Sequence, residues 1–424
     1  MSICIGMVIG AGIFKTSPMV AQSLDSANAL YLAWLLGGVL SLMGALCFAE
    51  ISSTFPHAGG DYYFLRKAYG ARTSFLFAWS RFAIIHTGSM ALLAFVCADY
   101  VNQVIPLGPM GSGVLAAVVI SALTVLNLRG VRIGLGAQVA LVLLVVVGLA
   151  CVVAGGLWLV GTQAAQPSTQ MPRETIAWGT AYVFVFLAYG GWSDASTLSS
   201  EMKDERRGIV WALIGGMLVV ALLYITANWA YVRGLGLEGL AKSEAPAADL
   251  MRVAFGKTGE WVIVVIVAIT AISVMNAILI TGARTTYAAA RDVPALAKLA
   301  VWDMSRGIPP VSLVAMGIVA IVLVGFGTAT RGGFSTMVDY LSPVYWAFCS
   351  MSAASVIILR KKFPDVPRPY RVPLFPWLPI AFCATCVYLL YSSVAYVALG
   401  ATVGLAVLLV GAAVMLVLER NGKR

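Results

Sequence analysis

The chain has 424 residues, of which 60% are hydrophobic and only 11% are charged. Soluble globular proteins have about 45–50% apolar and about 25% charged residues, so composition excludes a soluble protein and predicts a helical protein that crosses a membrane many times. The formal net charge of +10 raises the question of nucleic acid, but 20 of the 28 lysines and arginines fall in loops that the predicted topology places on one side. Such a bias sets orientation in the membrane, so nucleic acid is not expected as a partner.

Hydropathy predicts twelve membrane helices, because a bilayer core of about 30 Å needs about 20 helical residues. If both termini are cytoplasmic, the basic loops face the cytoplasm, as expected for a multi-pass protein of the inner (cytoplasmic) membrane. No basic segment precedes the first apolar run, so we expect no cleaved signal peptide. The predicted spans are 3–23, 30–54, 75–104, 113–129, 133–160, 176–200, 209–232, 259–287, 310–329, 337–360, 376–396 and 399–418.

The first span contains two glycines, Gly10 and Gly12, within the segment Ile9–Phe14. Each costs about 1 kcal/mol of helix propensity relative to alanine. Non-helical backbone at membrane depth is tolerated only where it is buried in protein or lines a cavity. The segment is therefore either a helix break that binds a substrate or ion, as in many transporters, or a stretch of small residues that lets helices pack closely.

Three connecting segments have a recognisable character. Residues 54–73 begin with turn residues and continue as a short amphipathic helix that ends near Gly70. Residues 233–257 form a polar loop, in which a helical pattern follows Pro246, and are expected to fold back as an external cap. Residues 363–376 form a proline-rich basic linker. No soluble domain is expected.

The sixth span repeats the glycine pattern with Gly190 and Gly191 and adds a carboxylate, Asp194. The two glycine pairs lie in the first helix of two successive groups of five helices, and because five is odd the second group enters from the opposite face. Breaks in corresponding positions indicate a LeuT-type inverted repeat with the site at the repeat interface. The expected fold is all-α, with a 5+5 repeat plus two C-terminal helices: 1–160 is the first repeat, 176–360 the second, and 361–424 the last two helices and a short tail.

Six motifs follow one another along almost the whole chain. They are Ile9–Phe14 with Pro18, Glu50 with Pro56-x-Ala58-Gly59-Gly60-Asp61-Tyr62, Asn127-x-x-Gly130-Val131-Arg132 with Gln138, Tyr189-Gly190-Gly191-Trp192, Arg284-x-x-Tyr287-x-x-x-Arg291-Asp292, and Pro367-Arg368-Pro369-Tyr370-Arg371-Val372-Pro373. Together they resemble the amino acid–polyamine–organocation (APC) superfamily, nearest its bacterial amino acid permeases. The resemblance implies a small-molecule amino acid substrate. We expect no cofactor and no metal site.

The resemblance also implies how the substrate is held. Its α-carboxylate would meet backbone N–H groups around Gly10–Gly12, and its α-amino group would meet carbonyl groups around Ile9 and Ala188–Gly190. Freed backbone offers both donors and acceptors to a zwitterion from which water is excluded. The predicted substrate-binding residues are Ile9, Gly10, Ala11, Gly12, Ile13, Ala188, Tyr189, Gly190, Gly191, Trp192, Gly88, Ser89 and Asn276.

Several of these side chains have an alternative explanation. Tyr189 and Trp192 are read as a gate or pocket wall, or as ordinary packing of the bundle. Gly88 and Ser89, near the middle of the third span, either line the pocket or pack against a neighbouring helix. Weaker candidates occur in the eighth and tenth spans: Met275, Asn276, Ser342, Tyr345 and Ser350.

Two titratable residues are candidates for coupling transport to an ion gradient. A carboxylate near mid-membrane is costly unless it is paired or hydrated, so Asp194 either carries a proton during transport or holds the unwound segment by hydrogen bonds. His86 either hydrogen-bonds within the bundle or moves protons. Arg81 is expected to pair with Glu50. Sodium is also open, since Ser273 is one possible oxygen ligand.

Relatives in the superfamily can carry a lysine in the fifth helix in place of a sodium ion. That position here is near Val145, and residues 133–160 contain no lysine, so this mechanism is not carried over. Residues 105–112 contain no cysteine, so no disulfide-linked partner is expected, and the protein is a monomer or weak homodimer in the lipid bilayer. The cysteines are read as packing residues rather than a redox or metal site; they are Cys4, Cys47, Cys97, Cys151, Cys349, Cys383 and Cys386.

The sequence therefore predicts a secondary active transporter, a permease or exchanger of amino acids that works by alternating access. A polyamine or other organocation carrier is the alternative of the same fold, but it would favour several acidic residues at the cavity and only Asp194 is evident. A non-transporting amino acid sensor would want a large output domain. An enzyme is not expected, because His57 and His86 are far apart in sequence and form no catalytic set.

Overall fold

The structure, a computed structural model, describes residues 10, 12–57, 59–108, 110–130, 135–162, 170, 176–195, 208–291, 294–395 and 399–421. This part of the chain is almost entirely helical and has no β-strand. The helices are α2 (Ile13–Ser23), α3 (Ala27–Thr54), α4 (Asp61–Tyr69), α5 (Ala71–Ser80), the π-helical η1 (Arg81–His86), α6 (Thr87–Val104), α7 (Gly111–Leu128), α8 (Leu135–Gly161), α9 (Trp178–Tyr189), α10 (Trp192–Ala195), α11 (Gly208–Lys242), α12 (Pro246–Arg291), the 3₁₀ turn η3 (Pro294–Leu299), α13 (Pro310–Ala329), α14 (Phe334–Lys362), α15 (Trp377–Ala395) and α16 (Leu399–Asn421).

Ten helices in the described residues are long and apolar enough to span a membrane. The two predicted spans that do not qualify are the first and the sixth. Their described helices α2 and α9 have only 11 and 12 residues, and these are the two spans with paired glycines. The predicted membrane protein is confirmed, and the predicted total of twelve spans stays a prediction.

The third span runs from α5 through η1 to α6 without a gap, but its middle, Arg81–His86, is π-helical. A π-helical turn adds one residue to the turn and changes the direction of the side chains on either side of it, and such turns are frequent at functional sites. It places Arg81 and His86 inside the bundle, where both are buried.

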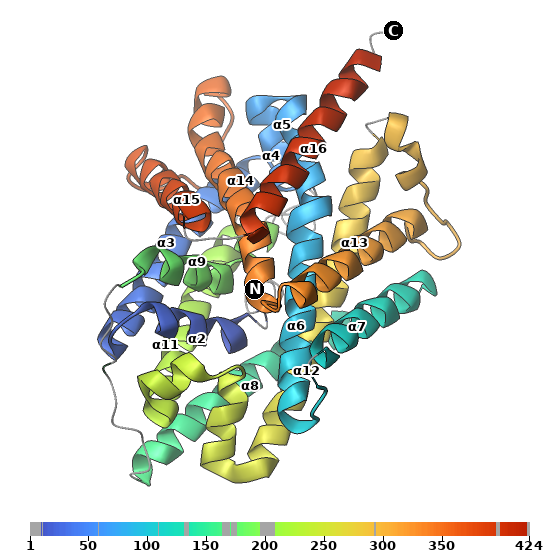
Figure 1. The fold of residues 1–424 in the computed structure, drawn as a ribbon. Coiled ribbons are helices and arrows are strands. Elements are labelled where there is room, and N and C mark those ends of the chain that lie inside the picture. The colour runs from blue at the N-terminus through green and yellow to red at the C-terminus, as the bar shows by residue number, and fades with distance from the viewer. Residues whose placement is uncertain are drawn as a thin grey trace.

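The amphipathic helix expected in residues 54–73 is present as α4. Gly60 before it has φ 47° and Gly70 after it has φ 100°, backbone conformations that favour glycine. Figure 1 shows α4 at the end of the bundle where the C-terminal end of α16 also lies. The expected linker 363–376 is also present, as non-helical chain between α14 and α15.

Within residues 233–257, the helical pattern expected after Pro246 is present as the start of α12, whereas the part before it, expected as a loop, is largely helical. Helix α11 continues through a bend at Gly236 to Lys242, and α12 begins at Pro246, where the missing N–H of proline costs no helical hydrogen bond. These extensions lie at the end of the bundle opposite α4 (Figure 1). They are tied to α2, since Gln22 Nε2 donates to Ala241 O at 2.6 Å.

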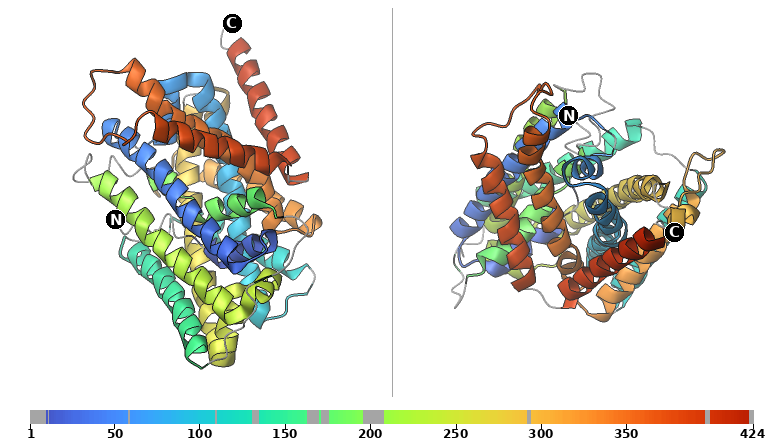
Figure 2. Two further views of the ribbon diagram at one scale, coloured as in Figure 1. Left: turned by 90° about the vertical axis from the view of Figure 1, so that its left-hand side faces the viewer. Right: turned by 90° about the horizontal axis from the view of Figure 1, so that it is seen from above.

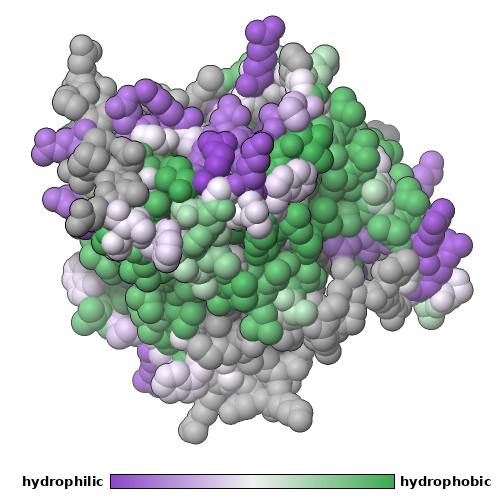
Figure 3. All heavy atoms as spheres, turned by 90° about the horizontal axis from the view of Figure 1, so that it is seen from below, coloured by the Kyte–Doolittle hydropathy of each residue, from purple (hydrophilic) through white to green (hydrophobic). Residues whose placement is uncertain are grey.

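Large apolar side chains lie exposed along the helices, including Trp211 at 74% and Leu409 at 69%. Figure 3 shows hydrophobic residues over much of one face, with hydrophilic residues gathered above its centre and at its edges. Such a surface suits lipid rather than water. The two views of Figure 2 show the helices gathered into one bundle, from which the end of α16 extends.

Candidate functional site

The two glycine segments lie against each other. Gly12 is the N-terminal boundary of α2, and its carbonyl accepts from Lys15 N and Thr16 N at 2.9 Å each. Helix α9 ends at Tyr189, the backbone is non-helical at Gly190 (ψ 178°) and Gly191 (φ 94°), and α10 begins at Trp192. A β-carbon added to Gly12 would lie 3.8 Å from the Cα of Ala188. The start of α2 and the end of α9 therefore meet inside the bundle.

The predicted backbone contacts are described only in part. Ile9 and Ala11 lie outside the described residues, Gly10 is not helical, and Ile13 is the buried first residue of α2. The Ala188 carbonyl already accepts from the Tyr224 hydroxyl at 3.2 Å. Sequence reasoning missed this tyrosine, which belongs to α11 and shares no motif with the glycine segments.

The aromatic residues beside the second interruption make packing contacts. The Tyr189 hydroxyl donates to Trp34 O at 3.0 Å, and its ring lies 5.1 Å from that of Tyr224. Trp192 meets Phe48 edge to face, with ring centroids 5.0 Å apart. These are the contacts of the packing alternative, and the gate or pocket role stays a prediction.

The other predicted pocket residues are held by neighbouring helices. Gly88 is buried against Tyr340 of α14, and Ser89 is half-buried. Asn276 Oδ1 accepts from Asn127 Nδ2 at 2.6 Å, so this amide joins α12 to α7. Gly88, Ser89 and Asn276 do not line the small cavity beside Asp61 and Arg81, and their binding role stays a prediction.

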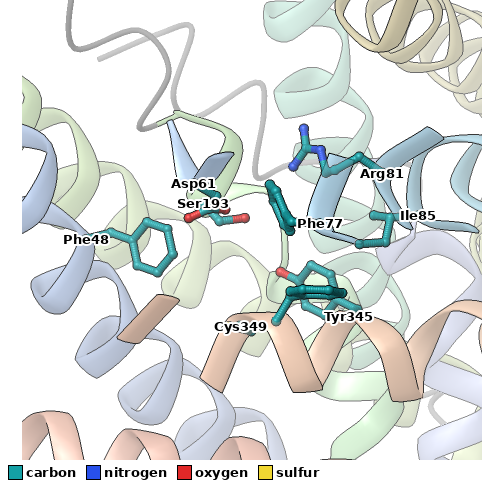
Figure 4. Close-up of a pocket in the computed structure, with 9 residues that line it drawn as sticks. Phe48, Asp61, Phe77, Arg81, Ile85, Ser193, Tyr345 and Cys349 are labelled. Carbon is teal, nitrogen blue, oxygen red and sulfur yellow. The ribbon is translucent and has the colours of Figure 1, made fainter. Parts of the chain in front are cut away.

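A small cavity lies between α3, α4, α5, η1, α10 and α14 (Figure 4). Its volume of about 10 Å³ is room for about one water molecule, not for an amino acid. Ser193 follows the second interruption and shares this cavity with Tyr345 of α14. The cavity is lined by Phe48, Asp61, Phe77, Arg81, Ile85, Ser193, Tyr345, Phe348 and Cys349; we call it the central cavity.

The expected pairing of Arg81 with Glu50 is wrong. Arg81 Nη1 lies 2.6 Å from Asp194 Oδ1, because the π-helical turn directs the guanidinium toward α10. Glu50 instead accepts two hydrogen bonds from Arg360, at 2.6 and 2.5 Å, and one from Val372 N at 2.6 Å. The linker after α14 folds back onto the end of α3, which no local pattern in the sequence indicates.

The two coupling candidates lie together. His86 is buried on η1, close enough to Arg81 and Asp194 to interact electrostatically with both. Its Nδ1 has no hydrogen-bond partner among the described residues. Asp194 is held by the guanidinium of Arg81, which agrees with the alternative that it holds the unwound segment by hydrogen bonds. Proton coupling through Asp194 or His86 stays a prediction.

A second charged cluster, which sequence reasoning missed, lies at the other end of the continuous helix α5–η1–α6 that carries Arg81 and His86. Lys15, in the first turn of α2, places Nζ 2.6 Å from Asp99 Oδ2 and donates to Glu244 O at 2.8 Å. The side chains of Lys15 and Asp99 are only 6% and 19% exposed. A signal was available, because a lysine and an aspartate inside apolar spans are expected to pair.

A tyrosine completes this group, which we call the α2 cluster. The Tyr100 hydroxyl donates to Phe14 O at 2.7 Å and accepts from Ala247 N at 3.3 Å. Helix α6 and the α11–α12 connection thus both hold the first turn of α2. Arg81 and Asp99 are 18 residues apart on one continuous helix, a separation of roughly 27 Å at about 1.5 Å per residue.

The cysteines are closer together than the sequence suggests. Cys349 of α14 lies beside Cys386 of α15, a partner that the Cys383-x-x-Cys386 spacing did not reveal. All described cysteines are free thiols. Within the described residues, no group of three or more His, Cys, Asp or Glu side chains is arranged to hold a metal ion.

Comparison with known proteins places the chain in a family. The sequence profile of the family described as "Amino acid permease" matches residues 1–417. The chain belongs to this family. As an amino acid permease by family, it is a membrane transporter and not an enzyme, and the predicted resemblance to the APC superfamily is confirmed.

Named relatives of this permease are similar over nearly the whole chain. It is 27% identical to the large neutral amino acids transporter small subunit 2 of Mus musculus, over 96% of this chain and 78% of that protein. It is 28% identical to the b(0,+)-type amino acid transporter 1 of Mus musculus, over 92% and 80%. It is 28% identical to the serine/threonine exchanger SteT of Bacillus subtilis (strain 168), over 93% and 89%.

Proposed function

We propose that the protein is a secondary transporter that carries amino acids across the cytoplasmic membrane by alternating access, as a permease or an exchanger. The observation that carries this proposal is the meeting of Gly12 and Ala188, each at an end of a short helix inside the bundle. The family of the chain and the carriers among its relatives support an amino acid as the substrate.

The proposed site uses backbone rather than fixed charges. Helix α2 begins directly after Gly12, so in the proposed site the N–H groups around Gly10–Gly12 meet the carboxylate at a helix N-terminus, where the helix dipole favours it. Helix α9 ends before Gly190, and in the proposed site the carbonyl groups around Ala188–Gly190 accept from the ammonium group. Ile9, Ala11 and the other predicted pocket residues complete this proposed site.

The proposed topology is the one that the sequence predicts. Twelve spans form two inverted five-helix repeats, 1–160 and 176–360, followed by two helices in 361–424, with both termini in the cytoplasm. This topology is supported by the position of α4 and of the C-terminal end of α16 at the same end of the bundle. Residues 54–73 and the tail are both basic segments that the prediction places on the cytoplasmic side. We keep the expectation of a monomer or weak homodimer without a disulfide-linked partner.

The test is transport by purified protein in liposomes. A panel of labelled amino acids is offered with and without internal amino acid, and under imposed pH or sodium gradients. Uptake that needs internal amino acid identifies an exchanger, and accumulation driven by a gradient identifies the coupling ion. Uptake of a diamine such as putrescine in place of every amino acid would favour the organocation carrier, and absence of any uptake would contradict the proposal.

A further inference from the structure

One carboxylate in the central cavity, Asp61, has no ionic partner of its own among the described residues. Asp61 opens α4, yet it is only 8% exposed. Its Oδ1 accepts no hydrogen bond from any described residue. Figure 4 shows Asp61 beside Ser193, on the wall of the cavity that Arg81 also lines. A buried polar atom without a partner is costly, and a buried unpaired charge is more costly still.

Among the described residues at the cavity, two carboxylates, Asp61 and Asp194, face one guanidinium, that of Arg81, so the charges do not balance when both are ionised. Arg81 provides one positive charge, and its Nη1 lies 2.6 Å from Asp194. Asp61 therefore faces a guanidinium that another carboxylate already holds, and it meets that carboxylate's charge as well. Among the described residues, the titratable and polar groups that face it are Arg81 and His86 on η1, Ser193 and Asp194 on α10, and Tyr345, Cys349 and Ser352 on α14.

We propose that Asp61 is a proton-binding site, and that its proton is taken up when the central cavity closes toward the cytoplasm. This rests on the proposed alternating-access cycle, in which α4 belongs to the cytoplasmic end. When α4 moves away from α14 and α5, water reaches the carboxyl and the proton leaves to the cytoplasm. Closing takes one proton from the same side, so the neutral acid is buried and the one guanidinium remains paired with Asp194.

The direction of the pH effect follows from the two environments. Burial raises the pKa of Asp61 to about 7, opposed by the charge of Arg81 and increased by that of Asp194. In water an aspartate has a pKa of about 3.9. The closed conformation therefore holds more protons between about pH 4 and 7, and it loses up to tenfold in relative population for each unit of pH rise in that range. Above about pH 7 the effect saturates, so going from pH 7.5 to 6.0 favours closing by about eightfold.

Cys349 provides a reporter, because it lines the same cavity and is buried in this structure. In a variant whose other six cysteines are replaced, a maleimide reaches Cys349 only when the cavity opens. Its labelling rate in liposomes is measured at pH 7.5 and 6.0, with and without Asp61→Asn. At each pH, the labelling rate with Asp61 is divided by the rate with Asp61→Asn, so that the titration of the thiol itself cancels. We expect this ratio, Asp61 over Asn, to fall about eightfold from pH 7.5 to 6.0.

Matched variants separate titration from a structural role. Asp61→Glu keeps a titratable group and should keep the pH effect, as should Asp365→Asn, which removes an exposed carboxylate from the basic linker. Asp61→Ser replaces Asp61→Asn if the latter does not reach the membrane. A ratio that does not change with pH overturns the proposal. Labelling needs no substrate, so this outcome is distinct from a failure to transport any amino acid, which would contradict the proposed function instead.

Discussion

The buried ion pair of the α2 cluster predicts a large effect of one substitution. In Lys15→Met the ammonium group is lost and Asp99 is left without its partner in a mostly buried position. The backbone carbonyl of Glu244 also loses its donor. In the proposed topology this end of the bundle faces outward, so the variant should favour opening of α2 and the α11–α12 connection toward the outside.

The size of the effect follows from the burial of the pair. Removing one partner of a buried salt bridge costs about 3–5 kcal/mol, whereas replacing both by apolar groups is often neutral. The Asp99 side chain is 19% exposed and gains some hydration, so we take the lower end, about 3 kcal/mol. That value corresponds to roughly a hundredfold shift toward the open conformation.

Ala247 offers a reporter position, since it is fully buried and its N–H donates to Tyr100. Ala247→Cys is labelled in intact cells by a membrane-impermeant thiol reagent, and the parent chain without this change gives the background. We expect Lys15→Met to raise the labelling rate by roughly a hundredfold, and Lys15→Met with Asp99→Leu to return most of the way to the starting rate.

An exposed ion pair on the same connection is the control. Lys242 and Glu238 pair at 2.6 Å with side chains 72% and 57% exposed, and exposed pairs contribute little. Lys242→Met should leave the labelling of Ala247→Cys unchanged. The reasoning is refuted if Lys15→Met labels no faster than Lys242→Met while both proteins are present in the membrane in normal amounts.

Three further substitutions test the rest of the structure. Gly12→Leu places a side chain against the end of α9 and should abolish amino acid binding in a thermal-shift assay, with the protein still in the membrane; unchanged affinity would contradict the proposed pocket. Glu50→Gln leaves the Arg360 guanidinium without its carboxylate and should lower stability by about 3 kcal/mol, seen as a lower thermal midpoint in detergent. Asp194→Asn tests proton coupling through that residue: because Asp194 stays paired with Arg81, we expect accumulation driven by a pH gradient to persist, and its loss would make Asp194 the proton carrier.

The fold was predictable because membrane helices are specified locally. A run of about 20 apolar residues specifies a span whatever surrounds it, and predicted 310–329 coincides with α13. Paired glycines likewise identify the positions where α9 ends and α2 begins, because they weaken a helix through their own backbone. The extension of α11 to Lys242 was missed, since polar residues at a membrane surface read as a loop although helix packing keeps them helical.

Which side chains pair with one another in the folded bundle was harder to predict from the sequence. Arg81 was paired with the wrong carboxylate because the direction of its side chain depends on the π-helical turn Arg81–His86, which composition does not encode. Asp61 was noticed only as part of a motif. Its importance comes from burial under α14, and a sequence shows neither the burial nor the guanidinium already taken by Asp194.

The α2 cluster and the Arg81–Asp194 pair at the central cavity lie toward opposite ends of one helix, and this leads to a last prediction. Arg81 and Asp99 share the continuous rod α5–η1–α6, so alternating access requires one end to stay paired while the other opens. Lys15→Met destabilises every conformation in which the outer end is closed, including the one open to the cytoplasm. The labelling of Cys349 from the cytoplasmic side should therefore fall by up to roughly a hundredfold in this variant. If labelling of Cys349 and of Ala247→Cys rises together, the substitution loosens the bundle as a whole, and the two clusters do not act as alternating closures.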